Sequence, residues 1–116
     1  MNAGRILDLI NKTEMHTICV STKTIHVILE LISKEKLPFV KNVIHFDPID
    51  EGTIIKASTI DIKLFSFKAL LSEAESLPEY PKEEPKSETI FLLGVSSGTT
   101  GDPKASMLSH LNFISG

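Results

Sequence analysis

The chain has 116 residues, 41% of them hydrophobic, and a formal net charge of −3 at pH 7. This length suits one domain at most, and the charge gives no reason to expect nucleic acid or an anionic membrane as partner. No apolar run is long enough to span a membrane, and the first residues lack the apolar segment of a signal peptide. The single cysteine, Cys19, excludes an internal disulfide. We therefore expect a soluble intracellular protein.

Strand-like and helix-like patterns alternate along the first two thirds of the chain. Ile25, Ile28, Leu29 and Ile32 follow the i, i+3, i+4, i+7 spacing of one helix face. Such alternation is typical of α/β proteins, in which a parallel sheet is flanked by helices. In chain order the patterns predict a helix over 3–13, a strand over 17–20, a helix capped by Ser21 or Thr22, a strand over 42–46, a weaker helix over 50–59, a strand over 62–65 and a helix over 67–76.

Residues 78–88 differ in kind from what precedes them. Three prolines and six charged side chains in this stretch cannot form a packed element. We interpret it as an exposed connector. The chain then divides into a partial α/β subdomain (1–77), the connector (78–88), and a last segment (89–116). This last segment holds a strand, a loop, a second strand over 105–109 and the start of a helix.

The loop of the last segment has the composition of an anion-binding site. It follows a short apolar run, 90–95, which reads as a buried strand. Glycines let backbone N–H groups converge on a ligand, hydroxyls add rotatable donors, and a lysine supplies positive charge. These features predict a phosphate-binding site made of Ser96, Ser97, Gly98, Thr99, Thr100, Gly101 and Lys104.

Two common phosphate-binding fingerprints do not fit this loop. The P-loop pattern places a lysine directly after its second glycine, whereas here Asp102 and Pro103 separate Gly101 from Lys104. The dinucleotide pattern G-x-G-x-x-G fails because three residues separate Gly94 from Gly98.

The run does resemble the signature loop of the adenylate-forming (AMP-binding) enzyme superfamily. That signature reads approximately Thr-Ser-Gly-Thr-Thr-Gly-x-Pro-Lys-Gly-Val and is followed by a histidine. This chain has Ser-Ser-Gly-Thr-Thr-Gly-Asp-Pro-Lys over 96–104, then Met-Leu-Ser-His over 107–110. The continuation is most similar to the long-chain fatty acyl-CoA synthetases. Ala105 and Ser106 depart from the usual Gly-Val without removing a phosphate donor.

The resemblance implies a fold, an activity and a set of small-molecule partners. The chain would be a slice of the large N-terminal domain of an acyl-activating enzyme, incomplete at both ends. The whole enzyme would be an acid–thiol ligase that uses ATP, Mg²⁺ and coenzyme A to form a fatty acyl-adenylate and then the thioester. The loop would hold the ATP phosphates, with no catalytic nucleophile or base among its residues. By the same resemblance, the enzyme would lie in the cytoplasm or on the cytosolic face of the endoplasmic reticulum or another membrane, attached through regions outside this sequence. This slice alone would be inactive.

The remaining candidates favour structural explanations. His16, His26 and His45 lack metal-like spacing, so we expect structural or surface roles and no metal site. Cys19 lies in an apolar run and is expected to be a small buried residue. His110 directly follows the signature and is a candidate for fixing the loop or touching its ligand.

Two alternatives to a long-chain fatty acid–CoA ligase stay open. One is an adenylate-forming ligase for another carboxylic acid, because the acyl pocket is not in this sequence. The other is a non-catalytic nucleotide- or phosphate-binding module that uses the loop alone.

Overall fold

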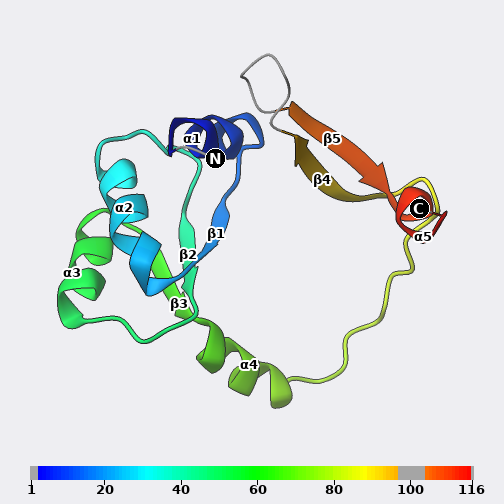
Figure 1. Ribbon diagram of the computed structural model, residues 1–116. Coiled ribbons are helices and arrows are strands. Elements are labelled where there is room, and N and C mark those ends of the chain that lie inside the picture. The colour runs from blue at the N-terminus through cyan, green and yellow to red at the C-terminus, as the bar shows by residue number, and fades with distance from the viewer. Residues whose placement is uncertain (1–2, 97–103, 116) are drawn as a thin grey trace. The chain divides into compact units, whose positions relative to one another are not determined.

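The computed structural model describes the backbone of residues 3–96 and 104–115, and side chains for residues 4–94, 106–112 and 114. The chain divides into two compact units, residues 10–78 and residues 79–116 together with 1–9. Each unit contains its own sheet (Figure 1). Within the described ranges, no helix combines the length and the apolar character that crossing a membrane requires.

The unit of residues 10–78 is built on a three-stranded parallel sheet in the order β1-β2-β3. Each strand is joined to the next by a helix, as parallel pairing requires. This confirms the predicted α/β class with flanking helices. Its elements are β1 (Thr17–Val20), α2 (Thr22–Ser33), β2 (Asn42–His45), α3 (Glu51–Thr59), β3 (Lys63–Ser66) and α4 (Phe67–Glu75); α1 (Ala3–Lys12) begins in the other unit and ends in this one.

Helices α2 and α3 contact each other and lie on the same side of the sheet (Figure 1). Alternate strand residues point toward them, and Val20, Val43 and His45 are buried. Leu29 of α2 is completely buried. The core of this unit therefore lies between the sheet and these two helices. Its buried hydrophobic residues are Ile10, Val20, Ile25, Leu29, Leu37, Val40, Val43, Ala57 and Ile62.

The second face of the sheet is only partly covered by the described residues of this unit, and Ile44 and Phe65 on it are half-buried. Cys19, Ile44 and Phe65 are cross-strand partners on this face, and Cys19 is exposed. A shallow hollow lined by Ile44, Phe65 and Leu70 opens beside them. The expectation that Cys19 is buried was wrong. The continuous apolar run Thr17–Val20 does not reveal which of its faces is covered.

Helices α1, α2 and α3 all end in the same unusual way. The second residue after each helix is not glycine yet has positive φ: Glu14 (51°), Glu35 (57°) and Asp61 (58°). After α2, the N–H of Lys36 donates to the carbonyl oxygen of Leu31 at 3.0 Å, which is the Schellman closure. The left-handed conformation is costly for a residue with a Cβ atom, so each helix end carries strain.

We expect Glu35→Gly to raise the free energy of unfolding by about 0.5–1 kcal/mol. Glycine removes the left-handed strain, and its greater freedom in the unfolded chain offsets part of the gain. Urea unfolding of both proteins measures the difference. Glu30→Gly is the control, because Glu30 is an exposed glutamate inside α2, where glycine should destabilise the helix. Equal or lower stability of Glu35→Gly would contradict the strain argument.

The N-terminus of α3 is held by Asp50. Its Oδ1 accepts the backbone N–H of Thr53 at 2.8 Å and also the Thr53 hydroxyl. These hydrogen bonds, the hydroxyl first and the amide second, lower the pKa of Asp50 below its ordinary value of 3.8. The cap explains why a helix forms at residues 51–59 although Gly52 and Thr53 disfavour one.

Asp50→Ala should lower the midpoint of thermal unfolding by a few degrees at pH 7, because the capping acceptor is lost. Since the folded pKa is lowered, the stabilisation by the carboxylate is complete above pH 3.8 and is lost as the pH falls through the folded pKa. Asp50→Ser keeps a capping oxygen that does not titrate. Its melting point should show less acid dependence in that window, and matching acid curves for the two proteins would refute the assignment.

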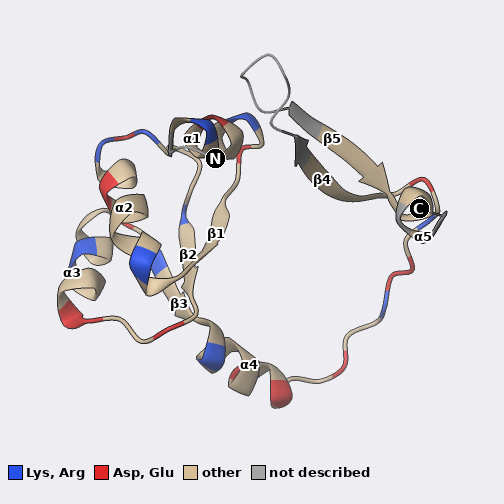
Figure 2. Ribbon diagram, in the orientation of Figure 1, with Lys and Arg blue, Asp and Glu red and all other residues tan. Residues whose placement is uncertain are grey.

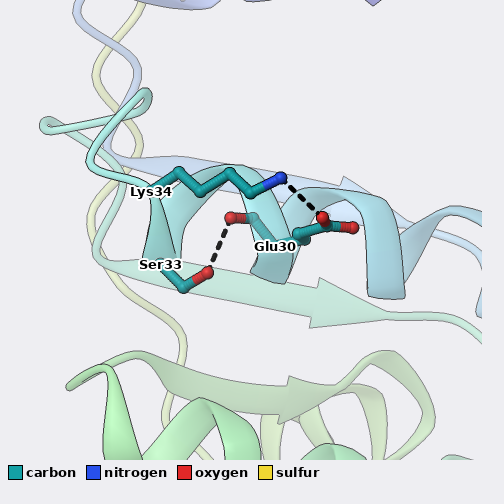
Figure 3. Close-up of polar contacts among 3 residues, drawn as sticks. All are labelled: Glu30, Ser33 and Lys34. Atoms are coloured by element: carbon teal, nitrogen blue, oxygen red, sulfur yellow. Dashed lines mark hydrogen bonds and ion pairs between the residues drawn. The ribbon is translucent and has the colours of Figure 1, made fainter.

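The last turn of α2 has a local polar network (Figure 3). Lys34 Nζ lies 2.7 Å from Glu30 Oε1, and the Ser33 hydroxyl donates to the Glu30 carbonyl oxygen at 2.7 Å. The hydrogen bond from Lys34 and its charge lower the pKa of Glu30. Both side chains of the ion pair are more than half exposed, so the pair supports the helix end without adding much to stability.

The unit that contains residues 79–116 is an antiparallel hairpin followed by a short helix. Its elements are β4 (Ile90–Ser96), β5 (Lys104–Ser109) and α5 (His110–Ser115). Acidic and basic side chains are scattered along the segment that leads into it, whereas the described side chains of the hairpin carry no charge (Figure 2). Apolar side chains are exposed on it, namely Ile90, Phe91, Leu92, Leu93, Met107 and Leu108, at 38–69%.

We expect the purified 116-residue chain to aggregate or to unfold at low temperature. A two-stranded hairpin with exposed apolar side chains and open edges is marginal in water and prone to pair with other copies. Size-exclusion chromatography and a thermal melt at several concentrations test this. A monomer with a cooperative transition at high temperature would contradict the expectation.

Candidate functional site

The candidate phosphate-binding loop connects the two strands of the hairpin. Ser96, the last residue of β4, is the Cα partner of Lys104, the first residue of β5. The hairpin therefore brings the two ends of the signature together at its tip. The predicted site residues between them, Ser97, Gly98, Thr99, Thr100 and Gly101, lie outside the described residues.

The pairing of β4 with β5 contains one irregularity. Ile90 pairs with Ser109, but Leu92 pairs with Leu108, so Phe91 is an extra residue on β4. This is a β-bulge, which bends a strand and changes the register beyond it. The bulge lies near the base of the hairpin, at the end away from the loop.

The base of the hairpin is held by an aromatic pair that includes the bulged residue. The ring of His110 meets the ring of Phe91 edge to face, with centroids 5.0 Å apart and an interplanar angle of 69°. The backbone N–H of His110 donates to the Thr89 carbonyl oxygen at 3.0 Å, and that of Leu111 donates to the Ser87 carbonyl oxygen at 3.0 Å. The first N–H groups of α5 thus tie the end of β5 to the chain that enters β4.

Ser109 and Asn112 form a reciprocal cap at the start of α5. The Asn112 N–H donates to Ser109 Oγ at 3.2 Å, and Asn112 Oδ1 accepts the Ser109 N–H at 3.1 Å and the Ser109 hydroxyl at 2.9 Å. This is the geometry of a capping box with asparagine in place of the usual Glu or Gln. It fixes the direction in which the chain leaves β5.

His110 is placed at the opposite end of the hairpin from the loop. The six residues of β5 separate it from the loop, which corresponds to about 20 Å at the usual rise per residue. Of the two roles predicted for His110, direct contact with a loop ligand is therefore not supported. A role in fixing the hairpin remains.

The other histidines have the structural or surface positions that the sequence predicts. His45 is buried at the end of β2, and its Nδ1–H donates to the Asp47 carbonyl oxygen at 2.7 Å. His16 and His26 are exposed. Within residues 3–96 and 104–115, no three His, Cys, Asp or Glu side chains are grouped so that they could hold a metal ion.

The hollows of the parallel-sheet unit are poorer candidates for a site. One of about 490 Å³ is lined by Leu37, Val40 and Ile62, near the amino ends of β2 and β3. Ligands of open parallel sheets bind outside the carboxyl ends of the strands. We therefore assign no functional site to this hollow.

The contact between Phe91 and His110 and the cap made by Ser109 and Asn112 were not predicted from the sequence. The spacing Ser-x-x-Asn at the start of a helix was a usable signal for the cap. The ring contact was not visible, because it depends on a bulge that no local pattern marks.

Comparison with known proteins gives the family of the chain. The family model described as "AMP-binding enzyme" matches residues 1–116. Rat long-chain-fatty-acid–CoA ligase 5 is 30% identical over 119 residues, which cover 99% of this chain and 17% of that protein. Acyl-CoA synthetase 7 of Caenorhabditis elegans is 34% identical over 104 residues, covering 90% of this chain and 17% of that protein. The chain thus spans about one sixth of the length of these relatives.

Solved structures share the fold of this chain. The adenylation domain of a carboxylate reductase from Mycobacterium chelonae superposes with a TM-score of 0.78 at 18% identity, over 96% of this chain and 19% of that domain. The A-PCP didomain of the carboxylic acid reductase from Segniliparus rugosus, solved in complex with AMP, superposes with a TM-score of 0.78 at 16% identity. The match covers 98% of this chain and 18% of that chain. Together with the family match over the whole chain, these findings show that the chain belongs to the AMP-binding, adenylate-forming enzyme family.

Proposed function

We propose that this chain supplies the ATP phosphate-binding loop of a long-chain fatty acid–CoA ligase. The observation that carries the proposal is the β4–β5 hairpin, which joins Ser96 and Lys104 across the glycine- and hydroxyl-rich signature. Family membership supports an ATP-dependent acid activation, and the matched relatives named as acyl-CoA synthetases support the fatty acid as the acid.

The chemistry explains why this composition is needed. A carboxylate must attack the α-phosphorus of ATP, which is surrounded by negative oxygens, while pyrophosphate leaves. Hydrogen-bond donors and a cation held at the β- and γ-phosphates lower the energy of this step, because they stabilise the charge that develops on the leaving group. In the proposal, Thr99 and Thr100 donate hydroxyl hydrogen bonds and Lys104 supplies the cation. The complete set is Ser96, Ser97, Gly98, Thr99, Thr100, Gly101 and Lys104, and these residues orient and stabilise without forming a covalent bond.

Mg²⁺ and coenzyme A belong to the proposal for the whole enzyme. The described part of the chain offers no group of metal ligands. When bound, coenzyme A would supply the thiol that displaces AMP from the acyl-adenylate. We assign no residue of this chain to that thiol.

The departures from the family signature are compatible with the proposal. Ser106 lies opposite Gly94 in the hairpin and is exposed, so its hydroxyl is hydrated and needs no buried partner. Ala105 pairs with Val95 as an ordinary strand residue. Neither position belongs to the proposed set of phosphate donors.

The test begins with the complete transcript that encodes this sequence. Its product is assayed for ATP–pyrophosphate exchange with palmitate, with an aromatic acid, with an amino acid, and without acid. Exchange that depends on palmitate supports the proposal. Exchange with only one of the other acids would show that this acid, and not a long-chain fatty acid, is the substrate. ATP binding without any exchange would favour the non-catalytic module.

A further inference from the structure

We propose that Phe91 and His110 are positioning residues that set the register of the β4–β5 hairpin and thereby the pairing of Ser96 with Lys104, the two ends of the phosphate-binding signature. We call this pair the aromatic clasp. The inference rests on the proposed function of the loop, to which it adds two residues outside the signature. Neither residue is assigned a contact with the nucleotide.

The bulge at Phe91 determines the register of the hairpin. At the base, Ile90 pairs with Ser109, and beyond the bulge at Phe91 the pairing continues to Ser96 opposite Lys104. If Phe91 were not the extra residue while the base kept its pairing, Ser96 would no longer lie opposite Lys104. The two ends of the signature would then be out of register by one residue.

The aromatic clasp holds the bulge in place. A strand slip by one residue turns every side chain to the other face of a sheet, and registers are weakly specified where both faces are open. The described apolar side chains of β4 are all 40–48% exposed, so burial within this unit does not fix the register. The clasp can do so, because the ring of the bulged residue itself packs against His110 at 5.0 Å.

His110 is anchored at the base of the hairpin. Its N–H donates to the Thr89 carbonyl oxygen, and the two capping residues, Ser109 and Asn112, lie before and after it in the chain. His110 is therefore fixed to both strands at the base, through its backbone to the entry of β4 and through the chain to β5. A fixed ring at this point selects the bulge at Phe91 over one elsewhere on the strand.

The experiment is an ATP titration by calorimetry of the complete enzyme that the transcript encodes, with wild type, His110→Ala and His110→Phe. His110→Ala should weaken ATP binding by about three- to tenfold, as expected for loss of an aromatic pair. His110→Phe keeps a ring and should restore most of the affinity.

Two controls separate register from general damage. Met107→Ala removes a side chain that is 69% exposed on the same hairpin and outside the clasp, so it should leave ATP affinity unchanged. A double-mutant cycle with Phe91→Ala should show that the second substitution adds little once the first is made, because the rings act as a pair. An unchanged midpoint of thermal unfolding would show that the fold is intact in every variant.

The outcomes distinguish the two proposals. If wild type does not bind ATP, the proposed function of the loop is overturned and the clasp has no ligand site to position. If wild type binds and His110→Ala binds equally well, the clasp alone is overturned. Failure of His110→Phe to restore affinity would also overturn it, because a ring at this position would then not be what matters.

Discussion

Lys104→Ala is expected to lower ATP–pyrophosphate exchange by about a hundredfold in the complete enzyme, the usual cost of removing one preorganised stabiliser of transition-state charge. Lys104 begins β5 directly opposite Ser96, at the edge of the loop, where the leaving pyrophosphate would lie. Thr100→Val removes a proposed hydroxyl donor at nearly constant volume and should have a smaller effect in the same direction. Initial rates at saturating palmitate and ATP measure both.

Lys82→Ala is the matched control for charge. It removes the same side chain from the exposed segment before β4 and should leave exchange unchanged. Equal loss in Lys82→Ala and Lys104→Ala would point to a general effect of net charge. Full exchange in Lys104→Ala would remove Lys104 from the proposed phosphate site.

Leu29→Ala is expected to reduce the free energy of unfolding by roughly 2–5 kcal/mol, the range for a leucine deleted from a closed core. Leu29 is completely buried between α2 and the sheet, and the unit has few side chains of this kind. Since small domains are only marginally stable, this loss should unfold much of the population. Urea unfolding followed by circular dichroism measures it.

Val27→Ala is the control on the same helix. Val27 is 51% exposed, so its truncation loses little burial and gains helix propensity. Its midpoint should stay close to that of wild type. A Leu29→Ala protein as stable as Val27→Ala would mean that the core does not lie between α2 and the sheet.

The parallel-sheet unit was largely predictable because its residues agree at every level. The helical spacing of Ile25, Leu29 and Ile32 and the strand pattern before Asp47 gave the right elements in the right order. Residues 50–59 were the weakest helix, since Gly52 and Thr53 oppose it and only the cap by Asp50 overcomes them. The prediction that Cys19 is buried was wrong, because the sequence of a four-residue apolar strand does not indicate which of its faces is covered.

The candidate site was predictable in composition but not in its supporting structure. The signature itself indicated phosphate binding, and its position between two strands followed from the apolar runs on either side. The antiparallel pairing of these strands was not predicted, nor was the bulge at Phe91. Both depend on long-range register, which hydrogen bonds and ring packing decide and which a local pattern does not encode.

The strand order of residues 10–78 has a consequence for synthesis on the ribosome. Each strand of this sheet pairs with the strand that precedes it in the chain, and none is inserted between two earlier ones. A nascent chain emerging from its N-terminus can therefore add β2 to β1 and then β3 to β2 in the order in which they appear. β2 and β3 can therefore each form their hydrogen bonds with the preceding strand as soon as they have been synthesised.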